Sequence, residues 1–160
     1  MELTTITGLV VIALCVMIFV IIHKSRVNKE RELVNGLKAI ALSCNSDIQE
    51  VECGLEFAIG MSDVKDYVFF YKKRQDYTNE QYVPLSAVGK CYVQSVRRPH
   101  PAKGSTEVII DKLDLILEFK DKKLGQRRFE FYNSDERLQM NGEMQLIQNW
   151  ESIINNCLKK

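Results

Sequence analysis

The sequence has few of the residues from which catalytic and metal sites are usually built. Its two histidines, His23 and His100, have no cluster of Cys, Asp or Glu beside them, so no metal ion is expected. The motifs G-x-S-x-G, H-E-x-x-H, G-x-G-x-x-G and G-x-x-x-x-G-K-[ST] are also missing. Asp111, Asp114 and Glu118 form a carboxylate group, but they fall on the polar face of an expected strand, where side chains are usually solvated. We therefore expect a protein that is not an enzyme and uses no cofactor.

An excess of positive charge is missing as well. Lys and Arg number 22, and Asp and Glu number 21. Proteins that bind nucleic acids usually carry a strong basic excess. We therefore expect no nucleic-acid partner.

The cysteines lack the pattern of a disulfide framework or of a zinc site. Their number is odd, no C-x-x-C pair occurs, and one of them lies in a long apolar stretch. We interpret them as free thiols of a reducing compartment. They are Cys15, Cys44, Cys53, Cys91 and Cys157.

Charged residues are absent from residues 3–22, which are mostly apolar. About 20 residues at about 1.5 Å rise per residue span the ~30 Å hydrocarbon core of a bilayer, so residues 1–24 are predicted to form a transmembrane anchor. A cleaved signal peptide is disfavoured because no Lys or Arg precedes the stretch and bulky residues 21–24 follow it. Gly8 has Ile12 four positions later, so the small-residue dimerisation motif is absent. The residues that we expect to lie within the membrane include Leu3, Ile6, Leu9, Val16, Phe19 and Ile22.

Basic residues follow the apolar stretch, whereas only Glu2 and the α-amino group precede it. They are Lys24, Arg26, Lys29 and Arg31. The positive-inside rule then places the N-terminus outside and the C-terminal domain in the cytoplasm of a single-pass protein of the cell membrane. The same side chains could touch anionic headgroups, but we favour their role as the topology signal.

Residues 25–36 are predicted to be a helical juxtamembrane linker, since Val27 and Leu33 begin an apolar series with helical spacing. Gly36 weakens a helix, so we expect the helix to end near Val34 and a first strand to begin near Leu37. A separate domain is predicted over residues 37–160.

Within that domain, alternating apolar and polar residues predict strands at 51–59, 91–96, 113–119 and 128–132. Residues 67–71 predict a strand buried on both faces. We expect residues 72–80 to be a polar connection, residues 82–85 an edge strand, and residues 97–105, with two prolines, an exposed mobile loop.

The end of the domain predicts a helix. Residues 133–136 have helix-start chemistry, and an apolar stripe continues through Trp150, with the main helix beginning near Glu143. The fold class is therefore α+β: a transmembrane helix, then mostly antiparallel strands and a C-terminal helix whose apolar stripe packs on the sheet. Its expected core includes Phe69, Leu115, Leu117, Phe129, Phe131 and Trp150.

Strands followed by one helix with a central tryptophan resemble the pleckstrin-homology-like (PH-like) barrel. The similar segments are residues 82–88 (Tyr-Val-Pro-Leu-Ser-Ala-Val), 115–119, 129–132 and Trp150. The resemblance covers about residues 37–158 and implies a mostly antiparallel β-barrel or sandwich, in which two bent sheets are closed by the C-terminal helix. Inositide-binding members carry a basic cluster after their first strand. This chain departs from them, because Lys65 is the one basic residue among residues 60–66.

We expect the domain to be an interaction module that binds a protein or peptide at the membrane. The alternative is binding of anionic lipid headgroups through basic loops. The candidate contacts, for headgroups or an acidic partner, are Lys72, Lys73, Arg74, Arg97, Arg98, Lys103, Lys122 and Lys123.

Overall fold

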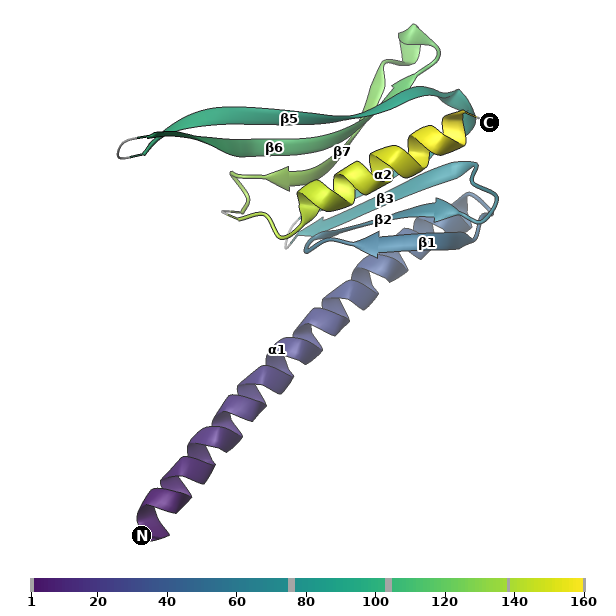
Figure 1. The fold of residues 1–160 in the computed structure, drawn as a ribbon. Helices are drawn as coiled ribbons and strands as arrows, with labels where there is room; N and C mark the ends of the chain where they lie inside the picture. Colours follow the sequence, from purple (N-terminus) through teal and green to yellow (C-terminus); the bar gives the residue numbers. More distant parts are fainter. Residues whose placement is uncertain (1, 75–76, 103–104, 138, 160) are drawn as a thin grey trace.

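The computed structural model describes residues 2–74, 77–102, 105–137 and 139–159, and it has the expected α+β architecture. A long N-terminal helix is followed by two antiparallel sheets and a C-terminal helix (Figure 1). The helices are α1 (Glu2–Ser43) and α2 (Glu143–Leu158), and two 3-10 turns are η1 (Leu85–Ala87) and η2 (Lys122–Leu124). The strands are β1 (Ile48–Cys53), β2 (Phe57–Ser62), β3 (Tyr67–Arg74), β4 (Tyr77–Pro84), β5 (Val88–Ala102), β6 (Ser105–Phe119) and β7 (Gln126–Asn133).

The strands form two separate sheets, with the orders β1-β2-β3-β4 and β5-β6-β7. The expected closed barrel is therefore not formed, because η1 carries the chain from β4 to β5 without a ladder between the sheets. Side chains connect the sheets instead. On one side Gln81 of β4 donates to the Arg128 carbonyl of β7 at 3.1 Å.

On the other side, α2 bridges the edges of the two sheets. Trp150 Nε1 donates to Glu52 Oε2 of β1 at 2.8 Å. Asn155 Nδ2 donates to the Cys91 carbonyl of β5 at 2.8 Å, and its Oδ1 accepts from the Cys91 N–H at 3.3 Å. The helix begins at Glu143, as predicted, whereas residues 134–136 form a turn and not the first helical turn.

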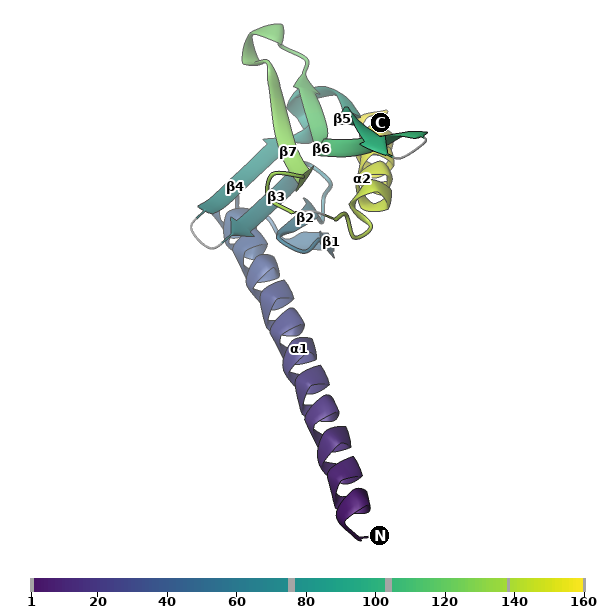
Figure 2. The same ribbon diagram turned by 90° about the vertical axis from the view of Figure 1, so that its left-hand side faces the viewer.

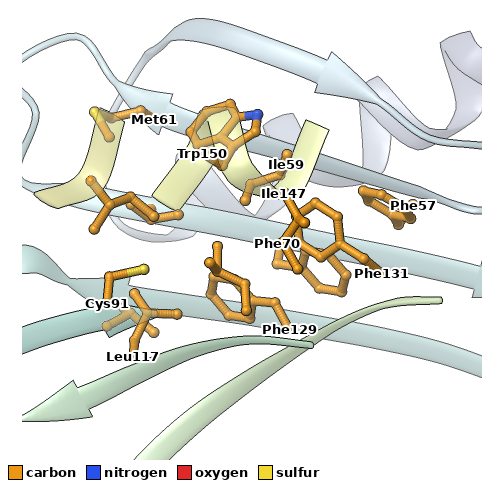
Figure 3. Packing of buried hydrophobic residues seen from close by; sticks show 14 of the residues in the cluster. Phe57, Ile59, Met61, Phe70, Cys91, Leu117, Phe129, Phe131, Ile147 and Trp150 are labelled. Atoms are coloured by element: carbon orange, nitrogen blue, oxygen red, sulfur yellow. The ribbon is translucent and has the colours of Figure 1, made fainter. Parts of the chain in front are cut away.

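The main core lies between the two sheets and α2. Figure 3 shows its aromatic residues beside Trp150. The ring centroids of Phe70 and Phe129 are 4.9 Å apart, and those of Phe57 and Phe131 are 4.6 Å apart. Leu115 and Leu117 are fully buried in the same core.

A second core lies on the outer face of the four-stranded sheet, because β3 is buried on both faces as predicted. Phe69 belongs to this second core, since neighbouring strand residues point to opposite faces. Its partners on α1 are Leu33, Leu37, Ile40 and Ala41. Each of these side chains is at most 5 % exposed.

The helix α1 runs without a break from the apolar stretch onto this sheet. The predicted helix end at Val34 and strand at Leu37 are therefore wrong. Gly36 does not end the helix but permits close contact, because a Cβ atom there would lie 2.3 Å from the Tyr71 ring. Within the described residues, α1 is the one helix long and apolar enough to cross a membrane by length and composition.

The hairpin of β5 and β6 extends beyond the ends of β7 and α2 (Figure 1). The mobile loop expected at residues 97–105 is therefore wrong, since pairing continues to Ala102 and Ser105. β5 is an edge strand, and Cys91 directs its backbone groups away from β6 to Asn155. One side of an edge strand has no partner strand, so such a strand can contain prolines such as Pro99 and Pro101.

Candidate functional site

A hollow of about 930 Å³ lies between α1 and the strand ends near the β3–β4 connection. We call it the α1–β3 groove. Its helical wall consists of Ser25, Asn28, Lys29, Glu32 and Leu33. Spacings of three, four and seven place these side chains on one face of α1. The opposite wall includes Lys73, Arg74 and Tyr77.

One ion pair joins the two walls of the groove, and two others lie within the strand wall. Lys73 Nζ lies 2.5 Å from Glu32 Oε1, which ties β3 to α1. The hydrogen bond to Glu32 and its negative charge raise the pKa of Lys73. Arg74 lies 3.0 Å from Glu136 Oε1 and 3.5 Å from Glu56 Oε2. Most charged side chains of the groove are therefore paired.

Lys72 lies behind this wall and is 3 % exposed. Its Nζ is 2.6 Å from Glu130 Oε1 and 2.8 Å from Glu136 Oε2. Burial alone would lower the pKa of Lys72, but the hydrogen bonds to both carboxylates raise it. The prediction that Lys72–Arg74 belong to a polar connection is wrong, because all three residues are in β3. Lys72 therefore forms ion pairs in the interior of the domain, and its ammonium group is not accessible to a lipid headgroup.

The Lys72–Glu136 contact predicts an acid-dependent loss of stability. Burial alone would raise the pKa of Glu136, but Lys72 and Arg74 lower it below its ordinary value of 4.5. A carboxyl with a lowered folded-state pKa contributes stability above its unfolded pKa and loses it as the pH falls through the folded value. Glu136→Gln should therefore be less stable than the wild type at neutral pH and should show a flatter stability profile below pH 4.5.

Urea unfolding of both proteins between about pH 3 and 7 measures this difference. Asp135→Asn is the matched control, since Asp135 is exposed in the same turn. Equal acid dependence of the wild type and Glu136→Gln would contradict the assignment.

The projecting part of the β5–β6 hairpin forms a second surface, which we call the arm (residues 96–99 and 108–110). Val96, Val108 and Ile109 are exposed on it by 44 %, 62 % and 40 %. The register places Arg97 opposite Ile110 and Arg98 opposite Ile109. The arm is therefore both apolar and cationic.

The predicted basic contacts do not converge on one face. Arg98 pairs with Asp111 at 3.0 Å, and Arg97 is exposed on the arm. Lys122 and Lys123 lie in η2, in the β6–β7 turn, at the end farthest from the N-terminus in Figures 1 and 2. Lys103 lies outside the described residues.

The span residues Leu9, Val16, Phe19 and Ile22 are all more than half exposed. Leu3 and Ile6 belong to α1, but their side chains are outside the described set. The flanking cations Lys24, Arg26, Lys29 and Arg31 are exposed on the same helix. The apolar part of α1 therefore contacts no other part of the described domain.

The three carboxylates of β6 do not form a site. Asp114 was expected to be solvated, but it is 1 % exposed and pairs with Arg128 at 3.0 Å. Burial raises its pKa, while Arg128 acts in the opposite direction. Asp111 pairs with Arg98 instead. Within the described residues, no group of three or more His, Cys, Asp or Glu side chains could hold a metal ion.

The cysteines are free thiols in the structure. Burial, with a smaller effect of Glu151, raises the pKa of Cys91 to about 12. Such a thiol is protonated at neutral pH and a poor nucleophile.

No protein-family model, curated protein or solved structure matches the chain. Its function must therefore be argued from its own geometry. Sequence reasoning missed the groove. The spacing of Ser25, Asn28, Lys29 and Glu32 indicates a polar helix face, but nothing in the sequence shows that β3 forms the other wall.

Proposed function

We propose that the chain is a single-pass membrane protein whose domain is a non-enzymatic interaction module on the cytoplasmic side of the cell membrane. The observation that carries the proposal is the continuity of α1, which joins an exposed apolar stretch to a buried contact on the domain. A continuous helix holds the domain at a fixed height and orientation, whereas a flexible linker would not. The flanking Lys and Arg residues support the cytoplasmic placement.

The order of the strands supports the PH-like resemblance. A four-stranded and a three-stranded antiparallel meander are followed by one helix, and Trp150 packs in the core between them. That fold serves many kinds of partner, so the fold alone does not define the function.

The arm is the surface that we propose for the partner. Exposed apolar side chains beside cationic ones suit a protein segment that is apolar and acidic. The fixed membrane tether raises the effective concentration of a partner in the same membrane, so modest intrinsic affinity is sufficient.

Site-specific photo-crosslinking of the full chain in its own membrane tests this proposal. A photoreactive amino acid at position 108 should give a discrete protein adduct, and the same group at position 124 should not. The two positions are matched, since Val108 and Leu124 are both 62 % exposed. Arg97→Glu should reduce the adduct about tenfold or more, while Lys122→Glu should leave it unchanged. Absence of a protein adduct at position 108 would overturn the assignment of the arm.

A further inference from the structure

We propose that the α1–β3 groove binds the headgroup of a zwitterionic phospholipid from the leaflet that α1 enters. The ligand class is a phosphate diester joined to an ammonium group. This inference rests on the proposed membrane insertion of α1, but it does not depend on the arm or on which side of the membrane the domain lies.

The height of the groove along α1 supports the proposal. Measured from Ile22, the last residue of the apolar stretch, Ser25 is about 4.5 Å and Glu32 about 15 Å farther along the helix axis. The headgroup layer is about 5–7 Å thick on each side of the hydrocarbon core. The groove therefore opens at the level of the headgroups and continues above them. Helix side chains lean toward the N-terminus, so those of Lys29 and Glu32, whose backbones lie about 10.5 Å and 15 Å beyond Ile22, point back toward this layer.

The polar groups of the helical wall lie in the order that a phospholipid headgroup requires. The phosphate is joined to glycerol and lies nearer to the hydrocarbon, and the ammonium group lies beyond it. Ser25, Asn28 and Lys29 are the donors nearer to the apolar stretch, and the acceptor Glu32 lies one turn beyond Asn28. Lys29 takes part in none of the ion pairs found among the described residues, so its ammonium group is open to a phosphate.

The carboxylate of Glu32 remains accessible at the upper end. Its side chain is 53 % exposed, and Oε1 accepts from Lys73. An ionised carboxylate attracts a cation by its charge, whether or not that cation carries N–H donors, so Glu32 also suits the ammonium end of the ligand.

The charges of the groove distinguish a zwitterionic ligand from an anionic one. Three cations and three carboxylates line it, so their formal charges cancel. They are Lys29, Lys73, Arg74, Glu32, Glu56 and Glu136. Because the groove has no net formal charge, it offers no general attraction to an anionic headgroup, whereas a zwitterionic headgroup leaves its charges balanced. Tyr77, 57 % exposed at the strand wall, is a residue type that is enriched at the membrane interface.

Native mass spectrometry of the full chain released from nanodiscs tests the inference. The nanodiscs contain equal amounts of phosphatidylcholine and phosphatidylglycerol, and the spectrum reports which lipid remains bound. We expect one retained phosphatidylcholine and a loss of about tenfold or more in Lys29→Glu, because a charge-assisted contact is replaced by repulsion. Lys122→Glu makes the same charge change in η2 and should retain the lipid.

Each other result has a defined meaning. Retention of phosphatidylglycerol in preference, no retained lipid, or equal retention by Lys29→Glu would overturn the headgroup assignment. Lys29→Glu keeps the Glu32–Lys73 pair, and its unfolding temperature should match the wild type, which separates binding from folding. Extraction of the wild-type chain from membranes by alkaline carbonate would instead overturn the proposed membrane insertion.

Discussion

Replacing Trp150 by alanine is expected to destabilise the domain by roughly 3–5 kcal/mol, the usual range for truncating a large buried aromatic residue. Trp150 is 1 % exposed and lies where α2 meets both sheets. Its truncation removes packing between the sheets and the hydrogen bond from Nε1 to Glu52. Because the sheets share no backbone ladder, side-chain contacts hold them together, and α2 contributes to these contacts through Trp150.

Trp150→Phe separates these two contributions. Phenylalanine keeps most of the apolar contact but loses the hydrogen-bond donor to Glu52. We therefore expect the free energy of unfolding to fall by about 1 kcal/mol, with a small further loss from the reduced packing. Urea unfolding followed by circular dichroism measures all variants without depending on tryptophan fluorescence. Equal loss of stability in Trp150→Ala and Trp150→Phe would show that packing of the indole ring is not the main contribution of Trp150 to the free energy of unfolding.

Replacing Gly36 by alanine is expected to destabilise the contact between α1 and the four-stranded sheet by about 1–3 kcal/mol. Alanine normally stabilises a helix by up to about 1 kcal/mol relative to glycine, so the expected sign is opposite to the helix propensity. The reason is the ring of Tyr71, whose nearest atoms would lie 2.3–2.5 Å from the new Cβ atom. Hydrogen exchange of residues 33–43 should become faster, since these residues form the docked part of α1.

A double-mutant cycle identifies the contact responsible. In the Tyr71→Leu background the ring is gone, and Gly36→Ala should become neutral or stabilising. Gly8→Ala is the control, because a Cβ atom at Gly8 meets nothing within 4 Å. If Gly36→Ala destabilises equally with and without Tyr71, the close contact is not the cause.

The sequence predicts the parts of the fold that local periodicity determines. Alternation places the second half of β6 and most of β7, and the continuous aromatic and β-branched run at 67–71 places β3. The apolar stripe places α2 and its start at Glu143. The prediction at Gly36 is wrong because a glycine is needed there for the close contact with the Tyr71 ring. Tyr71 is distant in the sequence, and helix propensity does not account for such a contact. Pro99 and Pro101 were misread because a proline is compatible with a strand only when that strand lies at an edge, and the edge is a property of the whole sheet.

The candidate sites, too, depend on contacts between residues that are distant in the sequence. Lys72 resembles a surface lysine in the sequence, and only the fold brings Glu130 and Glu136 to it. The groove requires α1 and β3 to lie side by side, which follows from the second core and not from any motif. Exposed positions such as Val108 are apolar in the sequence and would be assigned to a core by periodicity alone.

The continuity of α1 also determines the rotational orientation of the domain about the helix axis. Each residue of an α-helix turns by about 100°, so one residue inserted between Lys24 and Leu33 would swing the arm by about 100° around the helix axis. Seven inserted residues complete about two turns and would return the arm nearly to its first direction, about 10 Å farther along the helix axis from the apolar stretch. The number of residues in this short stretch therefore determines which way the domain faces relative to the apolar stretch of α1.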